Sequence, residues 1–275
     1  MSYFNRLISH GFLGLFIVLM LLPLYLAVVA ASNEGSAMMQ SQLPLFPGAS
    51  FFKNLKVVLT QGIAVTGGEP ITIMLLNSML MAFAIAFGKI ILALGSAFAL
   101  VYFDFPFKKS CFALIFATMM LPVEVRIVPT FQVVASFGLL NSFSGLSLPL
   151  LASATGTFLF RQFFKTIPKE LVDASKLDGA GPVRFFFDIV LPLSRTQIAA
   201  LFVILFVYGW NQYLWPLVIT TETKMATIVM GIRYLAGVAD QVPEWHYIMT
   251  VALIALAPPC MVVMLTQRWF EKGLK

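Results

Sequence analysis

The chain has 275 residues, of which 60% are hydrophobic and only 11% are charged, and its formal net charge is +6. Soluble domains are roughly half apolar and about a quarter charged, so this composition excludes a soluble globular protein. The basic residues lie at the ends of long apolar blocks and form no single stripe or arm, which argues against nucleic-acid binding. Lipid must therefore solvate most of the surface.

Six apolar blocks follow one another along the chain, each about as long as a spanning helix, which needs about 20 residues. They are Gly11–Ala31, Ile71–Val101, Cys111–Thr130, Phe137–Phe160, Ile198–Thr220 and Tyr247–Thr266. The sequence therefore predicts an all-α integral membrane protein with six transmembrane helices in a single domain, residues 1–275.

Three of these blocks need comment. The first resembles a cleaved signal because Arg6 precedes it and small residues end it, but its length favours a retained anchor. The third is strongly apolar only as far as Val123, where Glu124 and Arg126 follow. The fourth is rich in Ser, Gly and Thr, which suits a helix that faces protein inside the bundle.

The distribution of Lys and Arg predicts the orientation. With both termini in the cytoplasm, twelve basic residues lie on the inner side, five lie on the outer side and Lys89 lies within a span. The inner residues are Arg6, Lys108, Lys109, Arg161, Lys165, Lys169, Lys176, Arg184, Arg195, Arg268, Lys272 and Lys275, and the outer ones are Lys53, Lys56, Arg126, Lys224 and Arg233.

Two connections are long. Residues 32–70 form a predicted outer loop, irregular apart from a short helix near Phe51–Leu59. Residues 163–195 form a predicted inner loop, in which Pro168 begins one short helix that ends at Gly179. A second helix follows Pro182 and is stopped by Pro192. Residue chemistry alone fits either a docking loop or a hairpin lying on lipid headgroups.

The inner loop resembles the "EAA" loop of membrane subunits of binding-protein-dependent ABC importers. That loop has the form Glu-Ala-Ala, two residues, Asp-Gly-Ala, and then Ile-x-Leu-Pro some nine residues on. The matching residues are Asp173, Ala174, Ser175, Asp178, Gly179, Ala180, Ile189, Leu191 and Pro192. Two residues depart from the pattern. Asp173 replaces the leading Glu and keeps its negative charge, and Ser175 replaces the second Ala and keeps its small size.

The resemblance implies a type I importer permease fold whose cytoplasmic coupling helix lies between the fourth and fifth spans. It also implies the partners: a sister permease, two cytoplasmic ATPase subunits that bind ATP and Mg²⁺, and an outer substrate-binding protein. The chain would then be a multi-pass protein of the bacterial inner membrane, surrounded by lipid, with no cofactor of its own.

Three further segments are similar to the carbohydrate branch of this family, the maltose-type second permeases, and most of all to the permease subunits of sn-glycerol-3-phosphate importers. They are residues 121–126, 158–164 and 208–217. The resemblance implies sn-glycerol-3-phosphate or a related glycerophosphodiester as substrate, with a neutral sugar or oligosaccharide as the alternative.

Polar residues at membrane depth are candidates for the substrate pathway, because burying them in lipid is costly. They are Trp210, Asn211, Gln212, Tyr213 and Trp215 near Pro216, together with Arg126, Lys89 and Asn77. Each has an alternative. The aromatic residues can form an interfacial belt, and Arg126 can anchor at the interface while Glu124 pairs with another helix. Lys89 can extend to the interface or pair with a partner, and Asn77 can join two helices.

No enzymatic or nucleotide-binding motif stands out. The chain has no Gly-x-x-x-x-Gly-Lys-Ser/Thr loop, and His10 and His246 suggest neither a metal site nor a catalytic triad. A stand-alone secondary transporter would show internal repeats with interrupted half-helices, and a membrane-embedded enzyme would show clustered titratable groups. Neither pattern is evident, so both remain alternatives without positive support.

Overall fold

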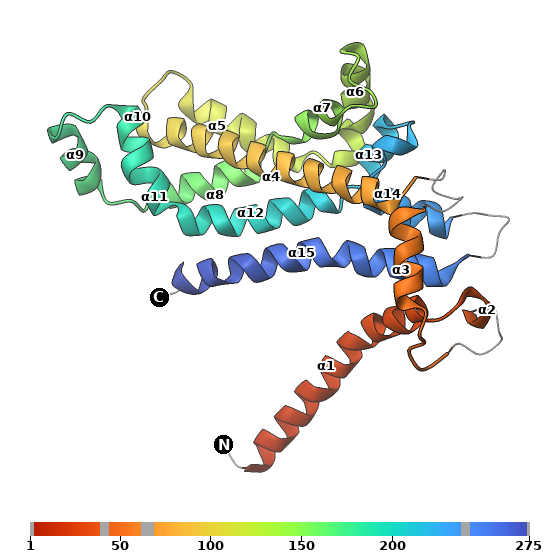
Figure 1. The fold of residues 1–275 in the computed structure, drawn as a ribbon. Helices are drawn as coiled ribbons and strands as arrows, with labels where there is room; N and C mark the ends of the chain where they lie inside the picture. The colour runs from red at the N-terminus through yellow and green to blue at the C-terminus, as the bar shows by residue number, and fades with distance from the viewer. Residues whose placement is uncertain (1–2, 39–43, 62–68, 238–242, 274–275) are drawn as a thin grey trace. The chain divides into compact units, whose positions relative to one another are not determined.

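The computed structural model describes residues 3–38, 44–61, 69–237 and 243–273, and all regular elements among them are helices (Figure 1). The predicted all-α class is thereby confirmed. The chain divides into two compact units: residues 1–75 with 228–258 form unit 1, and residues 76–227 with 259–275 form unit 2. The prediction of a single domain stays a prediction. Of the predicted outer loop, residues 39–43 and 62–68 lie outside the described residues, as does Lys275.

Unit 1 contains the first spanning helix and the segment that follows it. Its elements are α1 (Tyr3–Ser32), α2 (Gly35–Met38), α3 (Phe51–Thr60), α14 (Ile228–Ala236) and the first parts of α4 (Ile71–Tyr102) and α15 (Trp245–Gly273). In the most apolar stretch of α1, only 6% of the residues are buried. Its C-terminal end is held by Asn54 of α3, whose amide donates to the carbonyl oxygens of Ala31 and Asn33, at 2.9 and 3.0 Å. The predicted short helix near Phe51–Leu59 is confirmed by α3.

Unit 2 contains the rest of α4 and α15 and all helices between α4 and α14. They are α5 (Lys108–Ala117), η2 (Thr118–Met120), α6 (Val123–Ser136), α7 (Phe143–Ser147), η3 (Leu148–Leu150), α8 (Ala154–Phe164), α9 (Lys169–Leu177), α10 (Pro182–Phe185), η4 (Phe186–Val190), α11 (Leu191–Leu193), α12 (Arg195–Trp210), α13 (Leu214–Ile219) and η5 (Thr223–Met225).

Helices α4, α8 and α12 lie side by side in unit 2 (Figure 1), and small residues allow their close approach. A Cβ atom added to Gly209 of α12 would lie 2.9 Å from the Cα atom of Ala82 on α4. A Cβ atom added to Gly156 of α8 would lie 2.9 Å from the Cβ atom of Ala93. The helix α4 is therefore the centre against which the other two pack.

Three of the six predicted spans are confirmed as single long apolar helices. Among the described residues these are Ser9–Ser32, Ile71–Tyr102 and Trp245–Gln267. The prediction of one continuous helix over Cys111–Thr130 is wrong: α5 and η2 end before Leu121, and α6 begins at Val123. Pro122 explains the break, because proline lacks an N–H donor and disfavours the helical conformation of the residue before it.

The fourth and fifth predicted spans are also interrupted. The segments Phe143–Leu150 and Ala154–Phe164 meet at an angle of 48°, with the Ser153 hydroxyl capping α8 by accepting from the Gly156 N–H at 3.1 Å. In the fifth, α12 ends at Trp210 and α13 begins at Leu214. Pro216 is the third residue of α13, so the break lies close to it, directly before α13 begins.

Candidate functional site

The loop between α8 and α12 contains two short helices that turn sharply at Gly179. This residue has φ +70°, in the left-handed region, and the Gly179 N–H donates to the Lys176 carbonyl oxygen at 3.0 Å. The Ala180 N–H donates to the Ser175 carbonyl oxygen at 2.9 Å. These two bonds form a Schellman motif at the C-terminal end of α9. The prediction of two helices bent at Gly179 is confirmed.

One side of this loop is exposed and carries both apolar and acidic side chains. Leu177 is 89% exposed and Val183 is 71% exposed. Asp173 and Asp178 are exposed on the same segment, as are Ala174 and Gly179. Single exposed apolar side chains are common on protein surfaces, so their exposure counts here only together with the match of this segment to the importer motif. Together they make this side of the loop a candidate docking surface.

The other side of the loop packs against the end of α4. Ser175 is buried, Ala180 is half-buried, and both line a pocket of about 320 Å³ together with Phe98 and Tyr102. The ring of Phe185 on α10 lies 5.1 Å from that of Tyr102, edge to face. Of the residues matched to the importer motif, Ser175 and Ala180 therefore position the loop, whereas Asp173, Ala174 and Asp178 face outward.

The second helix of the loop ends beside Pro192, as predicted. The segment Pro182–Leu193 runs through α10, the π-helical turn η4 and α11, and it meets α12 at an angle of 72°. The segment ends at Leu193, directly after Pro192, so the prediction that Pro192 stops this helix is confirmed. The bend falls at Ser194, which is buried.

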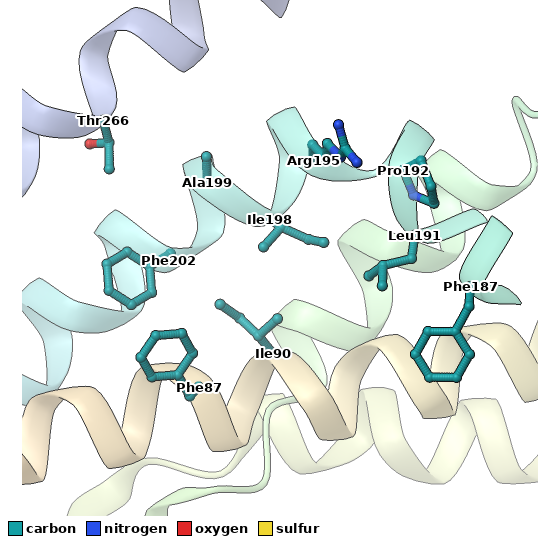
Figure 2. Close-up of a pocket in the computed structure, with 10 residues that line it drawn as sticks. All are labelled: Phe87, Ile90, Phe187, Leu191, Pro192, Arg195, Ile198, Ala199, Phe202 and Thr266. Carbon is teal, nitrogen blue, oxygen red and sulfur yellow. The ribbon is translucent and has the colours of Figure 1, made fainter. Parts of the chain in front are cut away.

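Residues at the end of this segment line an apolar groove of about 460 Å³ in unit 2. Leu191 and Pro192 belong to the motif, and they lie beside the facing pairs Phe87 with Phe202 and Ile90 with Ile198 (Figure 2). Figure 2 also shows Phe187, Arg195, Ala199 and Thr266 at its margin. Ile189 is half-buried. This part of the motif therefore anchors the loop to α4 and α12.

Two of the pathway candidates, Trp210 and Trp215, are fully buried. The Trp215 indole N–H donates to the Gly145 carbonyl oxygen at 3.1 Å, and its ring belongs to a core cluster with Met81 and Leu146. Trp210 stacks on Phe206 with ring centroids 6.0 Å apart. The contacts of both tryptophans are those of core residues.

The three residues between these tryptophans form the break between α12 and α13. Asn211 is exposed, and Gln212 and Tyr213 are half-buried. The Gln212 amide donates back to the Tyr208 carbonyl oxygen at 3.1 Å. A helix break at membrane depth is tolerated where it lines a cavity or is covered by protein, so these three are the members of the set best placed for a pathway.

Asn77 of α4 is buried and joins the helix to a distant loop. Its amide donates to the carbonyl oxygens of Lys224 and Ala226, at 2.7 and 2.9 Å. Both amide hydrogens are thereby used within the chain. Of the two interpretations of Asn77, this geometry favours the link between segments over a contact with substrate.

Lys89 of α4 is a cation within the bundle, with only 8% of its surface exposed. Its Nζ atom lies 4.4 Å from the centroid of the Tyr208 ring on α12. Among the described side chains, no carboxylate lies within ion-pair distance of Lys89. Arg126 of α6 is exposed and lies near enough for its charge to oppose that of Lys89. The side chain of Glu124 lies outside the described residues.

A metal site has no support in the described part of the chain, where no group of three or more His, Cys, Asp or Glu side chains comes together. Sequence reasoning missed a different feature. Lys108, Lys109, Arg161 and Lys165 had been counted only for orientation, yet they line one pocket at the ends of α4, α5 and α8. Their clustering within two short segments was the available signal.

Comparisons with known proteins agree with this geometry. Residues 89–275 match the family described as "Binding-protein-dependent transport system inner membrane component". The chain is 51% identical over 265 residues to the "sn-glycerol-3-phosphate transport system permease protein UgpE" of Yersinia pestis bv. Antiqua (strain Antiqua), covering 96% of this chain and 94% of that protein. It is 49% identical over 269 residues to the protein of the same name from Agrobacterium fabrum, covering 98% and 95%.

A solved structure shares the fold. The chain superposes with a TM-score of 0.84 on a chain from the "Crystal structure of a bacterial ABC transporter involved in the import of the acidic polysaccharide alginate", at 18% identity and covering 98% of this chain and 99% of that one. The expected type I importer permease fold is thereby confirmed. The chain belongs to the family of inner-membrane components of binding-protein-dependent transport systems.

Proposed function

We propose that the chain forms half of the pore of an ABC importer that carries sn-glycerol-3-phosphate or a related glycerophosphodiester. The proposed substrate rests on sequence identity: about half of the residues, over nearly the whole chain, are identical to those of permeases named for sn-glycerol-3-phosphate. The observation that supports the mechanism is the exposed, sharply bent loop at Gly179.

The partners follow from this assignment. A sister permease completes the pore, two ATPase subunits bind ATP and Mg²⁺, and a binding protein delivers the substrate from outside. The chain itself has no catalytic role. Both termini and residues 163–195 face the cytoplasm in this proposal, because that orientation places twelve of the basic residues inside and five outside.

The α9 helix is the element that docks to an ATPase. Movement of α9 passes through Gly179 into the segment Pro182–Leu193, whose end is anchored against α4 and α12. The connection to α12 is a bend at the single residue Ser194. Closure of the ATPases therefore moves α12, which ends at the Asn211–Tyr213 break, and this coupled movement alternates access to the pore.

The substrate pathway in this proposal includes the break at Asn211, Gln212 and Tyr213 and the two cations Lys89 and Arg126. A phosphate group passing through lipid-embedded protein needs positive charge and hydrogen-bond donors along its route. Lys89 supplies the charge inside the bundle, and the guanidinium of Arg126 matches phosphate oxygens in its geometry. Trp210 and Trp215 support this region from the core.

The test is ATP hydrolysis by the complete assembly in liposomes, with its binding protein present. We expect sn-glycerol-3-phosphate to stimulate hydrolysis and maltose to leave it at the basal rate. Replacing Lys89 with Met should weaken stimulation more than replacing it with Arg, since Arg keeps the charge. Stimulation by maltose alone would contradict the substrate, and transport by this chain without ATPase subunits would contradict the importer assignment.

A further inference from the structure

A positively charged pocket of about 460 Å³ lies in unit 2, where the connection between α4 and α5 passes beside the end of α8. Its polar lining consists of four cations, Lys108, Lys109, Arg161 and Lys165, and one carboxylate, Asp104. Apolar side chains, among them Phe112, complete the wall. None of these residues belongs to the coupling surface or the substrate pathway described above.

Only one of the four cations is neutralised. The Lys108 ammonium donates to the Phe103 carbonyl oxygen at 2.7 Å and pairs with Asp104 Oδ1 at 3.3 Å. Lys109 and Lys165 have no hydrogen-bond or ion-pair partner among the described residues. Lys109 and Lys165 are exposed, so water screens their charges, but four cations against one carboxylate leave the pocket with a net charge of +3, which attracts anions.

Arg161 gives the pocket a built donor. The centre of its guanidinium lies 4.0 Å from the centroid of the Phe112 ring, a stacked position that holds the group in place. Its Nε atom is buried and has no hydrogen-bond partner in the described part of the chain. Because protein covers that atom, a ligand in the pocket would meet the terminal nitrogens of the guanidinium, whose planar fork fits two oxygen atoms of a phosphate group.

The backbone adds to the positive potential. Helix α5 begins at Lys108, and its N-terminal end carries the positive end of the helix dipole. The preceding residue, Phe107, has φ 61° and offers no side-chain cap to the first N–H groups. The side chains and the helix end thus favour the same kind of ligand.

We propose that this pocket binds a phosphate-type oxyanion, either the phosphodiester of an anionic phospholipid or free inorganic phosphate. The ligand bridges α5 to the C-terminal end of α8, where Arg161 lies in the last turn and Lys165 is the C-cap residue. Helix α9 begins at Lys169, shortly after Lys165. A bound oxyanion therefore braces the base of the loop that docks to the ATPase.

The test measures binding to the full chain, co-expressed with its partner subunits, in nanodiscs. In one arm the nanodiscs contain phosphatidylglycerol, and native mass spectrometry counts retained lipid. In the other they contain only phosphatidylcholine, and inorganic phosphate is titrated while thermal unfolding is followed. We expect Arg161→Gln and Lys165→Gln each to lower the affinity for the ligand that binds, whether phosphatidylglycerol or inorganic phosphate, about tenfold. Each variant removes a charged contact to phosphate.

The control is Lys56→Gln, which removes the same charge from an exposed lysine on α3, far along the chain from the pocket. Retention of phosphatidylglycerol that falls in the pocket variants and not in the control identifies a lipid headgroup. Stabilisation by phosphate that is lost only in the pocket variants identifies the free ion. If the pocket variants and the control bind both probes alike, the proposal is wrong. The readout is binding, so it is independent of the transported substrate.

Discussion

At the scale of single residues, Gly179 stands out because its requirement is purely conformational. A Cβ atom at this position would meet nothing within 4 Å, so there is room for a side chain. The φ angle of +70° is the obstacle, since L residues with a Cβ atom disfavour the left-handed region by roughly 1–2 kcal/mol. The glycine therefore serves the turn and not a close contact.

Replacing Gly179 with Ala should loosen the turn between α9 and α10 and weaken the retention of ATPase subunits, with membrane insertion unchanged. Co-purification of the ATPase measures the effect. Gly181→Ala is the matched control, because Gly181 also has open space around it but has φ −69°, which any residue adopts. Equal losses in both variants would show that conformation at Gly179 is not the cause.

Contacts between residues far apart in the chain were the features of the structure that could least be predicted from the sequence. That Asn77 is polar and lies in a span is evident from the sequence, but its bonds to the carbonyl oxygens of Lys224 and Ala226 depend on how α4 meets a loop about 150 residues later. The same holds for Trp215, whose N–H reaches Gly145. Periodicity and hydropathy are local properties, so they cannot distinguish a buried link from a pathway residue.

At the scale of helices, the contact between α4 and α12 depends on Gly209. Gly209→Ala would place a Cβ atom against the backbone of Ala82, which cannot move aside as a side chain can, so the helices must separate. We expect a destabilisation of about 1–3 kcal/mol, measured as a lower unfolding temperature in detergent.

Gly95 provides the comparison for this change. Gly95 lies within α4, the helix that Gly209 of α12 packs against, but a Cβ atom at Gly95 would meet nothing within 4 Å. Gly95→Ala should leave stability unchanged or raise it by up to about 1 kcal/mol, because Ala favours the helix interior. A loss of stability as large as that of Gly209→Ala would mean that the cost at Gly209 does not come from the contact with Ala82.

Which helices could be predicted follows from how they are stabilised. Hydropathy alone suffices for α1, α4 and α15, because lipid solvation needs only length and apolar composition. It fails where Pro122 divides the third block, since a window average does not register one missing N–H donor. The turn at Gly179 and the end of the following helix beside Pro192 were predictable because their causes are local.

At the scale of the whole molecule, the chain is one component of an assembly, and Leu177 is the clearest sign of a missing neighbour. This side chain is 89% exposed at the end of α9. Leu177→Asp should weaken ATPase association about tenfold or more, since burying a leucine contributes about 1.5–3 kcal/mol. Titration of the purified ATPase against the permease pair measures the affinity.

The control for this change is Leu177→Met, which introduces an unbranched apolar side chain of similar volume and should bind nearly as the unmodified chain does. Loss of association in both variants, or in neither, would remove Leu177 from the docking surface. The pocket at Arg161 and Lys165 belongs to this scale as well, because a bound oxyanion would brace α5 against α8 close to the base of the same loop.

The exposed helix α1 has a consequence for how this sequence can vary. The large apolar side chains between Phe12 and Leu22 are exposed in the described part of the chain, and the hydrogen bonds from Tyr25 to Leu45 and from Asn54 to Ala31 fasten the C-terminal part of the helix. Exchanges among Leu, Ile, Val and Phe along that stretch therefore leave the fold of this chain unaffected. If natural variants nevertheless keep particular side chains there, the selective pressure on their shape must come from lipid or from another chain.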